Sequence, residues 1–235
     1  MTAPALITLE RVGVRHGTVT ALHPLDITVR RGEFIALVGA NGSGKTTLLQ
    51  ALHGMAVHSG QRRVAPEATA QAMVFQRPFL LRLSVRRNLE IALWLARVPP
   101  AERRSRAADA LQRVGLAGLG QRPARALSSG QQQRLALARA WAVRPAVLFL
   151  DEPTANLDPT AKNEVEALLA GFSADATTIV MSTHHLGQAK RLATRVVYLD
   201  HGHLRADLPT ERFFSERQDD RAERFLRGNL TWDMD

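Results

Sequence analysis

The feature that most constrains this chain is a glycine-rich stretch, GANGSGKTT, at residues 39–47. It follows a continuous apolar run, FIALVGA at residues 34–40, which is typical of a buried parallel strand. A helical pattern begins directly after it, at Lys45, and extends to about Gly54. Gly39, Gly44, Lys45 and Thr46 match the pattern G-x-x-x-x-G-K-[ST], in which backbone N–H groups surround a phosphate at a helix N-terminus. We therefore predict a phosphate-binding loop; the alternative is a glycine-rich turn without a ligand.

The rest of the chain alternates between strand and helix patterns. Strands are predicted at residues 6–17, 25–34, 70–76, 146–153, 176–183 and 195–204, and helices at 85–98 and 102–116, which Pro99-Pro100 separates. This alternation predicts an α/β fold with a mostly parallel sheet. We expect one domain, with a core at about 1–77 and 141–210, an inserted helical lobe at about 78–140 and a tail at 211–235.

Composition excludes several classes of protein. The chain of 235 residues has no cysteine, so disulfides, thiolate metal sites and cysteine nucleophiles are excluded. No apolar run approaches the length of a membrane span, and the N-terminus is interpreted as a first strand and not as a signal peptide. We therefore expect a cytoplasmic location.

The formal net charge is +9, and +5 of it lies between residues 82 and 106. That segment has seven arginines against two glutamates. The simplest interpretation is a solvated helical face; contact with anionic lipid headgroups or with a partner protein is the alternative. No nucleic-acid partner is expected, because no aromatic or glycine-rich RNA-binding pattern accompanies the charge.

A pair of carboxylates, Asp151 and Glu152, directly follows the apolar run VLFL. Beside a phosphate-binding loop, such a pair at a strand end suits metal binding and water activation. Thr46 and Asp151 would then hold Mg²⁺, while Glu152 would orient and polarise the attacking water. The alternative is that the two carboxylates cap the next helix.

Together these motifs resemble the ATP-binding cassette (ABC) ATPases over nearly the whole chain. The family's signature, approximately L-S-G-G-Q, appears here as LSSGQ at residues 127–131. The resemblance implies a P-loop NTPase (RecA-like) core, an N-terminal antiparallel β subdomain and an inserted α-helical subdomain. It implies ATP and Mg²⁺ as cofactors, with ATP held by Gly39, Asn41, Gly42, Ser43, Gly44, Lys45, Thr46 and Thr47.

Further residues match the family's motifs one by one. Gln76 at a strand end matches the Q-loop and would contact Mg²⁺ or the attacking water; an isolated surface glutamine is the alternative. Residues 155–158, ANLD, match the D-loop, which packs across a dimer. His184 matches the switch histidine that contacts the γ-phosphate, although His185 follows it directly. His16 falls where the family stacks an aromatic residue on adenine; a surface loop histidine is the alternative.

The resemblance also implies partners. Two cassettes would meet head to tail, so that Ser128, Ser129, Gly130 and Gln131 touch the γ-phosphate held by the second copy. Ser129 replaces the family's usual glycine, and an ordinary helix N-cap is the alternative for Ser128. Separate permease subunits would dock behind Gln76, with Phe79, Leu80 and Leu81 exposed for that contact; simple lobe core is the alternative.

The expected function is therefore ATP hydrolysis that powers solute import at the cytoplasmic face of the inner membrane, with a solute-binding protein involved indirectly. The segments 75–89, 182–202 and 221–232 resemble cassettes of oxyanion importers, especially the tungstate type. Two alternatives stay open: an ABC ATPase that acts on ribosomes or DNA without transport, and the cassette of a bacterial exporter.

Overall fold

The computed structural model describes residues 3–215 and contains two sheets. The smaller sheet is antiparallel, with the order β2 (Val19–Arg30), β1 (Ala5–His16) and β4 (Ser59–Val64). The larger sheet has the order β5 (Gln71–Val74), β6 (Val147–Asp151), β7 (Thr178–Ser182), β3 (Phe34–Val38), β8 (Arg195–Asp200) and β9 (His203–Pro209). Its strands are parallel except for β9. The α/β fold with an antiparallel N-terminal sheet is thus confirmed.

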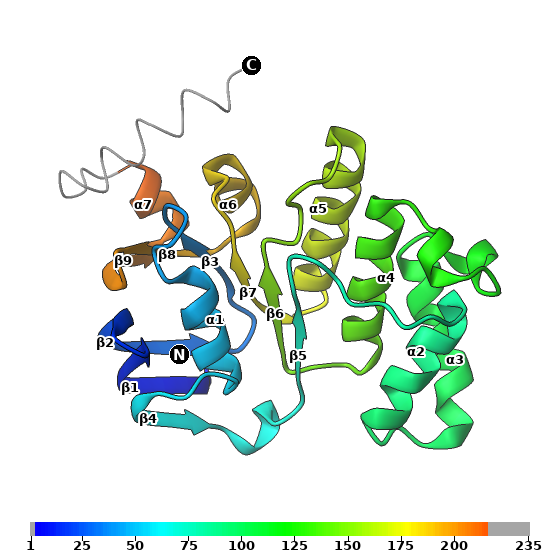
Figure 1. The fold of residues 1–235 in the computed structure, drawn as a ribbon, viewed down its shortest axis with the longest axis horizontal. Helices are drawn as coiled ribbons and strands as arrows, with labels where there is room; N and C mark the ends of the chain where they lie inside the picture. Colours follow the sequence, from blue (N-terminus) through cyan, green and yellow to red (C-terminus); the bar gives the residue numbers. More distant parts are fainter. Residues whose placement is uncertain (1–2, 216–235) are drawn as a thin grey trace.

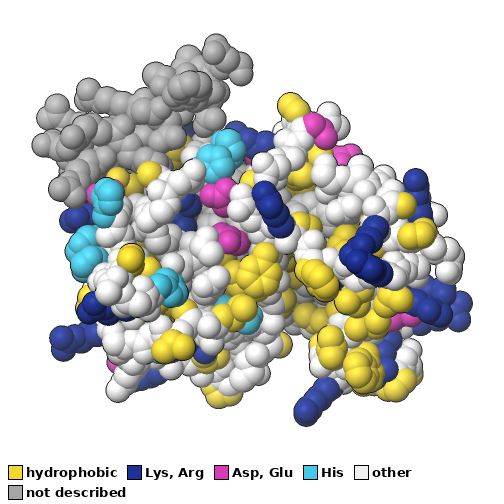
Figure 2. Space-filling view, in the orientation of Figure 1, with side chains coloured by type: hydrophobic (Ala, Val, Ile, Leu, Met, Phe, Trp, Pro, Cys, Tyr) yellow, Lys and Arg dark blue, Asp and Glu magenta, His cyan; other side chains and the backbone are white. Residues whose placement is uncertain are grey.

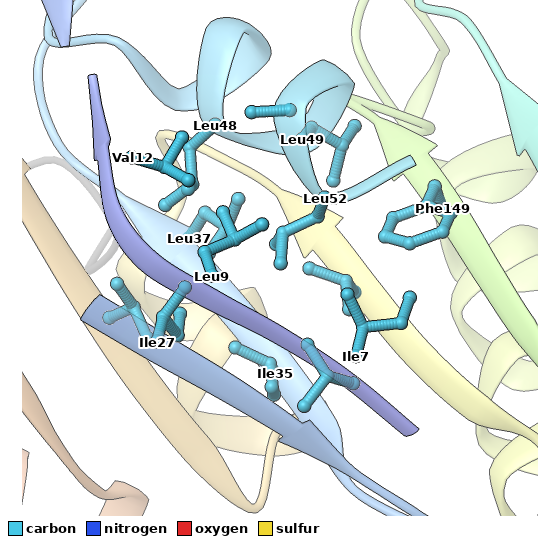
Figure 3. Packing of buried hydrophobic residues seen from close by; sticks show 14 of the residues in the cluster. Ile7, Leu9, Val12, Ile27, Ile35, Leu37, Leu48, Leu49, Leu52 and Phe149 are labelled. Atoms are coloured by element: carbon cyan, nitrogen blue, oxygen red, sulfur yellow. The ribbon is translucent and has the colours of Figure 1, made fainter. Parts of the chain in front are cut away.

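The central strands β3, β6 and β7 of the large sheet are buried on both faces, which is why their sequences are mostly apolar runs. On one face, Ile35 and Leu37 of β3 pack with the small sheet and with α1 (Lys45–His53). Figure 3 shows this core, in which α1 and β1 close over Leu37. On the other face, Phe34 and Val38 pack with residues of α4 (Ser129–Ala142), α5 (Pro159–Ala174) and α6 (Leu186–Leu192). The loop after β3 is therefore held between two cores.

A helical lobe lies at one side of the sheet (Figure 1). It consists of α2 (Val85–Leu95) and α3 (Pro100–Arg113), packed against α4 through Leu135, Ala138 and Ala142. Pro99 and Pro100 separate α2 from α3 as predicted, because proline suits a helix start but not a helix interior. Helix α4 belongs to both parts, since Leu135 and Ala138 pack into the lobe while Leu137 packs into the sheet core. It connects the lobe rigidly to the sheet.

The structure corrects two sequence expectations and adds one strand that was not predicted. Residues 195–204 form a hairpin of β8 and β9 and not one strand, because the chain reverses at His201 and Gly202. Strand β4 was not predicted, because its sequence SGQRRV is polar and its residues are exposed or half-buried at a sheet edge. Phe79 is 73% exposed, as expected, but Leu80 is only 7% exposed because it packs in the lobe core. The expectation that both residues are exposed was therefore wrong for Leu80.

The described residues also include η1 (Pro66–Ala68), η2 (Ala117–Leu119), η3 (Ala124–Ala126) and α7 (Thr210–Ser215). Most of the predicted tail, including the segment 221–232, lies outside the described residues. No helix between residues 3 and 215 is long and apolar enough to cross a membrane.

Candidate nucleotide site

The loop between β3 and α1 has the backbone that its glycines predict. Gly39 has φ +148° and Gly44 has φ +103°, both in the region that favours glycine. A Cβ at Gly39 would lie 2.3 Å from the carbonyl oxygen of Leu199, and one at Gly44 would lie 2.9 Å from that of Ala21. The loop therefore lies directly against β8 and β2, and larger residues at these two positions would displace it.

Lys45 is 5% exposed and lies inside this loop. Its Nζ donates to the carbonyl oxygens of Gly39, at 2.8 Å, and Ala40, at 3.0 Å. Burial lowers the pKa of Lys45 below its ordinary value, while the carboxylates of Glu152 and Asp151 act in the opposite direction. An ammonium has three donors, so the two bonds hold the group in place and leave one donor for a phosphate oxygen.

The carboxylate of Asp151, at the end of β6, accepts hydrogen bonds from two hydroxyl groups. Thr46 Oγ1 donates to its carboxylate oxygens at 2.9 and 3.1 Å, and Ser182 Oγ at the end of β7 donates to Oδ1 at 2.6 Å. Carboxylate and hydroxyl oxygens are ligands that Mg²⁺ accepts. The donor set at Thr46 and Asp151 therefore fits the predicted metal. Ser182 was not predicted, because only the pairing of β6 with β7 brings it to Asp151.

Glu152 lies beside His184, with 3.1 Å between Oε2 and the ring Nδ1. Its φ of +43° is unusual for glutamate, and its N–H donates to Ser182 Oγ at 2.9 Å. His184 is thus in contact with Glu152, and its imidazole ring lies 4.1 Å from that of His185.

These groups line a cavity of about 850 Å³. Figure 2 shows acidic (magenta) and histidine (cyan) side chains on the surface of the sheet-containing part of the molecule that faces the viewer. The described lining residues include Asn41, Gly42, Gly44, Lys45, Thr46, Thr47, Gln76, Asp151, Glu152, Ala155, Asn156, His184 and His185. A volume of this size is typical of ligand pockets. The structure thus brings the predicted Q-loop, D-loop, acidic pair and phosphate-binding loop to one place.

Of the residues predicted to hold ATP within one copy of the chain, three are not among the described lining residues of this cavity: His16, Gly39 and Ser43. His16 is exposed at the end of β1. Gly39 and Ser43 support the loop from behind, and Ser43 donates no described hydrogen bond from its buried Oγ. His16 pairs in the β1–β2 ladder with Val19, which does line the cavity, so His16 is adjacent to a residue of the cavity wall.

The LSSGQ segment lies apart from the cavity, at the start of α4. Ser128 is the N-cap of this helix: its Oγ accepts the Gln131 N–H at 3.3 Å, and Gln131 Oε1 accepts the Ser128 N–H at 3.1 Å. This capping box leaves further N–H groups of the first turn without intrahelical partners. Gly130 is buried, and a Cβ there would lie 2.7 Å from the Cβ of Ala161. Packing within the chain is therefore a second reason for glycine at position 130.

The fold and the site together define a P-loop nucleotide-binding ATPase. The family model described as "ABC transporter" matches residues 22–155. This match covers more than half of the chain. The chain therefore belongs to the ABC transporter family and is one of its ATPase cassettes.

Two curated relatives match over almost their whole length. The glutamate/aspartate import ATP-binding protein GltL of Escherichia coli (strain K12) is 33% identical, with 94% of this chain and 98% of that protein covered. The phosphate import ATP-binding protein PstB 2 of Natronomonas pharaonis is 35% identical, with 95% of this chain and 88% of that protein covered.

Solved structures share the fold. CbiO1 of Clostridium perfringens, part of an ABC transporter complex, matches with a TM-score of 0.80 and 27% identity, covering 98% of this chain and 99% of that one. The cassette MJ0796, solved as a dimer bound to ADP and phosphate, matches with a TM-score of 0.77 and 26% identity, covering 87% and 99%.

Proposed function

We propose that this chain is the ATP-binding and ATP-hydrolysing subunit of an importer and works on separate permease subunits at the cytoplasmic face of the inner membrane. The observation that carries the proposal is the cluster of Lys45, Thr46, Asp151, Glu152 and His184 around one cavity. The import functions in the names of GltL and PstB 2 support the direction of transport.

In this proposal the loop and Lys45 hold the phosphates of ATP. Thr46 and Asp151 hold Mg²⁺, which would neutralise charge on the phosphate oxygens. Gln76, which lines the same cavity, would contact the metal or the attacking water. Glu152 orients and polarises that water, and His184 positions Glu152 and contacts the γ-phosphate.

The second copy of the cassette would complete the site. The first turn of α4 offers N–H groups and a helix N-terminus, which attract an anion. We propose that Ser128, Ser129, Gly130 and Gln131 meet the γ-phosphate bound to the partner copy. The dimer of MJ0796 with ADP and phosphate supports this arrangement by similarity. ATP would hold the pair closed, and hydrolysis would release it.

The permease would dock on a groove between the sheet and the lobe. Phe75, Pro78, Phe79, Ala92 and Arg139 line this groove of about 380 Å³. Phe79 is largely exposed there, as a docking contact requires. Phe75 lines this groove and the next residue, Gln76, lines the nucleotide cavity. A conformational change of the permease would therefore be transmitted to the nucleotide cavity through a short segment of the chain.

The proposed solute is an oxyanion such as tungstate. The similarity to the phosphate importer PstB 2 supports an oxyanion. An amino acid is the second candidate, because the names of two relatives specify amino acids: glutamate/aspartate for GltL and glutamine for the transport ATP-binding protein GlnQ of Geobacillus stearothermophilus. GlnQ is 30% identical, with 94% of this chain and 98% of that protein covered.

The test is a tagged Glu152→Gln variant, measured first for ATP binding and hydrolysis. We expect ATP binding to be retained and hydrolysis to fall by at least about a hundredfold, the scale of losing general-base catalysis. The exposed Glu67→Gln is the matched control and should hydrolyse ATP at the normal rate. Hydrolysis by Glu152→Gln at the normal rate would exclude this role for Glu152.

Purification of the same variant from its native membranes, with ATP and Mg²⁺, tests the transport part. A multi-span permease that co-purifies supports import, and its solute-binding protein can then be tested with tungstate, molybdate, phosphate and glutamate. Ribosomes or DNA in its place would refute the transport function and favour the alternative in which the basic face binds nucleic acid.

A further inference from the structure

The end of the helical lobe carries an uncovered apolar surface, which we call the lobe tip. It comprises residues 94–101, from the end of α2 to the start of α3, and all of them except Val98 are exposed. Trp94 is 59% and Leu95 is 68% exposed, and the other exposed residues, apart from Arg97, are alanines and prolines. Figure 2 shows hydrophobic (yellow) side chains gathered at the lower end of the lobe with Lys or Arg (dark blue) beside them. Two adjacent large apolar side chains without cover indicate an interaction surface.

The turn that presents these side chains is fixed by hydrogen bonds. The Arg97 N–H donates to the carbonyl oxygen of Trp94 and the Val98 N–H to that of Leu93, both at 2.9 Å, which is the Schellman arrangement at a helix C-terminus. Leu93 and Val98 are buried in the lobe core, and Arg103 Nε donates to the Val98 carbonyl oxygen at 2.7 Å. Arg97, with φ +58°, occupies the position where glycine is preferred. Arginine gives the turn no advantage, so its charge indicates a role outside the turn.

The charge of the lobe tip is positive and largely uncompensated. Glu102 is the only acidic residue between positions 91 and 108, and its Oε2 lies 2.6 Å from Nη2 of Arg106. Arg97 and Arg104 are exposed, and neither has an ion pair with any residue that the structure describes. Arg87 is also exposed and lies two turns before Trp94 on the same face of α2. The surface therefore combines apolar side chains with cations that are available for an anionic partner.

We propose that the lobe tip binds the headgroup region of an anionic lipid bilayer. Tryptophan is enriched at this depth of a membrane, and arginine extends its charged end toward phosphate groups while its stem covers apolar surface. Acidic headgroups supply the charge that Arg97 and Arg104 lack within the chain. The tip is an exposed turn between two helices and lines no described cavity, so its shape suits a broad interface better than a protein helix that needs a groove.

The position of the lobe tip agrees with this partner. Ala92 lines the proposed permease groove, and Leu95 lies three residues later on the same side of α2. A permease in that groove is embedded in the bilayer, so the face that bears the groove would be turned toward the lipid. This step rests on the proposed function, whereas the composition and charge of the lobe tip do not. Permease docking and lipid contact would then act as two linked anchors, each of which can be weak alone.

The experiment is flotation of the full chain with large unilamellar vesicles at low salt. One set of vesicles is phosphatidylcholine, and the other is equal parts of phosphatidylcholine and phosphatidylglycerol. The apolar variant is Trp94→Gln with Leu95→Gln. The basic variant is Arg97→Gly with Arg104→Gln, in which glycine preserves the turn.

Each variant has a control with the same chemical change elsewhere. Met55→Gln with Val57→Gln removes two apolar side chains that are 53% and 92% exposed. Arg15→Gln with Arg205→Gln lowers the net charge as much as the basic variant does, at exposed positions of β1 and β9. Differences between a variant and its control therefore report the position and not the composition.

We expect the parent to bind the anionic vesicles and to bind phosphatidylcholine far more weakly. The basic variant should lower partition into anionic vesicles by about tenfold or more, the scale of two arginines at such a surface. The apolar variant should lower it by about tenfold, through loss of buried apolar area. Both controls should bind as the parent does.

Three results would overturn the proposal. One is a parent that does not bind anionic vesicles, and another is an equal loss in the arginine control, which would mean attraction by net charge alone. The third is normal vesicle binding by the apolar variant together with loss of the co-purified permease, which would make the tip a protein contact. ATP hydrolysis by the variants should equal that of the parent. Failure of lipid binding with normal hydrolysis therefore leaves the proposed function standing, and lipid binding without ATP binding refutes the proposed function alone.

Discussion

Substitution of Gly130 by alanine tests how α4 and α5 pack. The added Cβ would lie 2.7 Å from the Cβ of Ala161. Carbon atoms in contact prefer a separation of about 3.5–4.0 Å, so the two helix starts must separate by roughly 1 Å. Helix α4 is also part of both hydrophobic cores, through Leu135 and Leu137, and it has little freedom to move.

The expected cost of this overpacking is about 1–3 kcal/mol of unfolding free energy. For a chain of this size, a loss of about 2 kcal/mol lowers Tm by roughly 4–8 °C. Thermal unfolding followed by circular dichroism measures this loss. Ala161→Gly removes the opposing methyl group, so the double variant should regain most of the Tm lost by Gly130→Ala. Ala161→Gly alone should cost no more than about 1 kcal/mol, from helix propensity.

Two results would refute the reasoning. One is a Gly130→Ala protein as stable as the parent, and the other is a double variant that shows no recovery, since contacting residues must couple. ATP hydrolysis by the double variant then separates two roles of Gly130. Recovery of both stability and hydrolysis assigns the glycine to packing, whereas recovery of stability alone indicates a contact with the partner's nucleotide.

Three other predictions follow from single side chains. Lys45→Met should abolish tight ATP binding but raise the Tm of the nucleotide-free protein, because burial lowers the pKa of Lys45 and the charge costs stability at neutral pH. Ser182→Ala should cost about 1.5–3 kcal/mol of stability, because the Asp151 carboxylate loses its hydroxyl donor; it should also slow hydrolysis at limiting Mg²⁺. The pKa of His53 is lowered by burial and by Arg62, so the unfolded chain binds more protons there. Stability should therefore fall as the pH drops below about 6.5, and His53→Leu should reduce this pH dependence of Tm; an unchanged dependence would exclude His53 as its source.

Much of the site could be predicted from the sequence because its parts are local. The phosphate-binding loop requires glycines, a lysine and a threonine within one short segment, and positive φ at Gly39 and Gly44 agrees with that requirement. The acidic pair could be predicted because Asp151 and Glu152 directly follow an apolar strand. Likewise, the N-cap at Ser128 follows from a short local pattern, and the structure has the complete capping box.

Residues that depend on long-range pairing could not be predicted. Ser182 reaches Asp151 only because β6 and β7 are neighbours, and no local pattern identifies that neighbour. The polar strand β4 has no apolar alternation and exists because β1 offers it an edge. Leu80 and Phe79 are adjacent apolar residues, and only the packing of the lobe buries one and exposes the other.

The sequence by itself determined the class of fold and the phosphate-binding chemistry, because glycine geometry, strand burial and helix capping act within a few residues. The tertiary structure alone decided which groups meet: Ser182 with Asp151, His184 with Glu152, and Gly130 with Ala161. It also decided that His201, from a turn far along the chain, lines the same cavity as Lys45. The physical reason is that these contacts join separate elements, whose positions are set by the sheet order and by two shared cores.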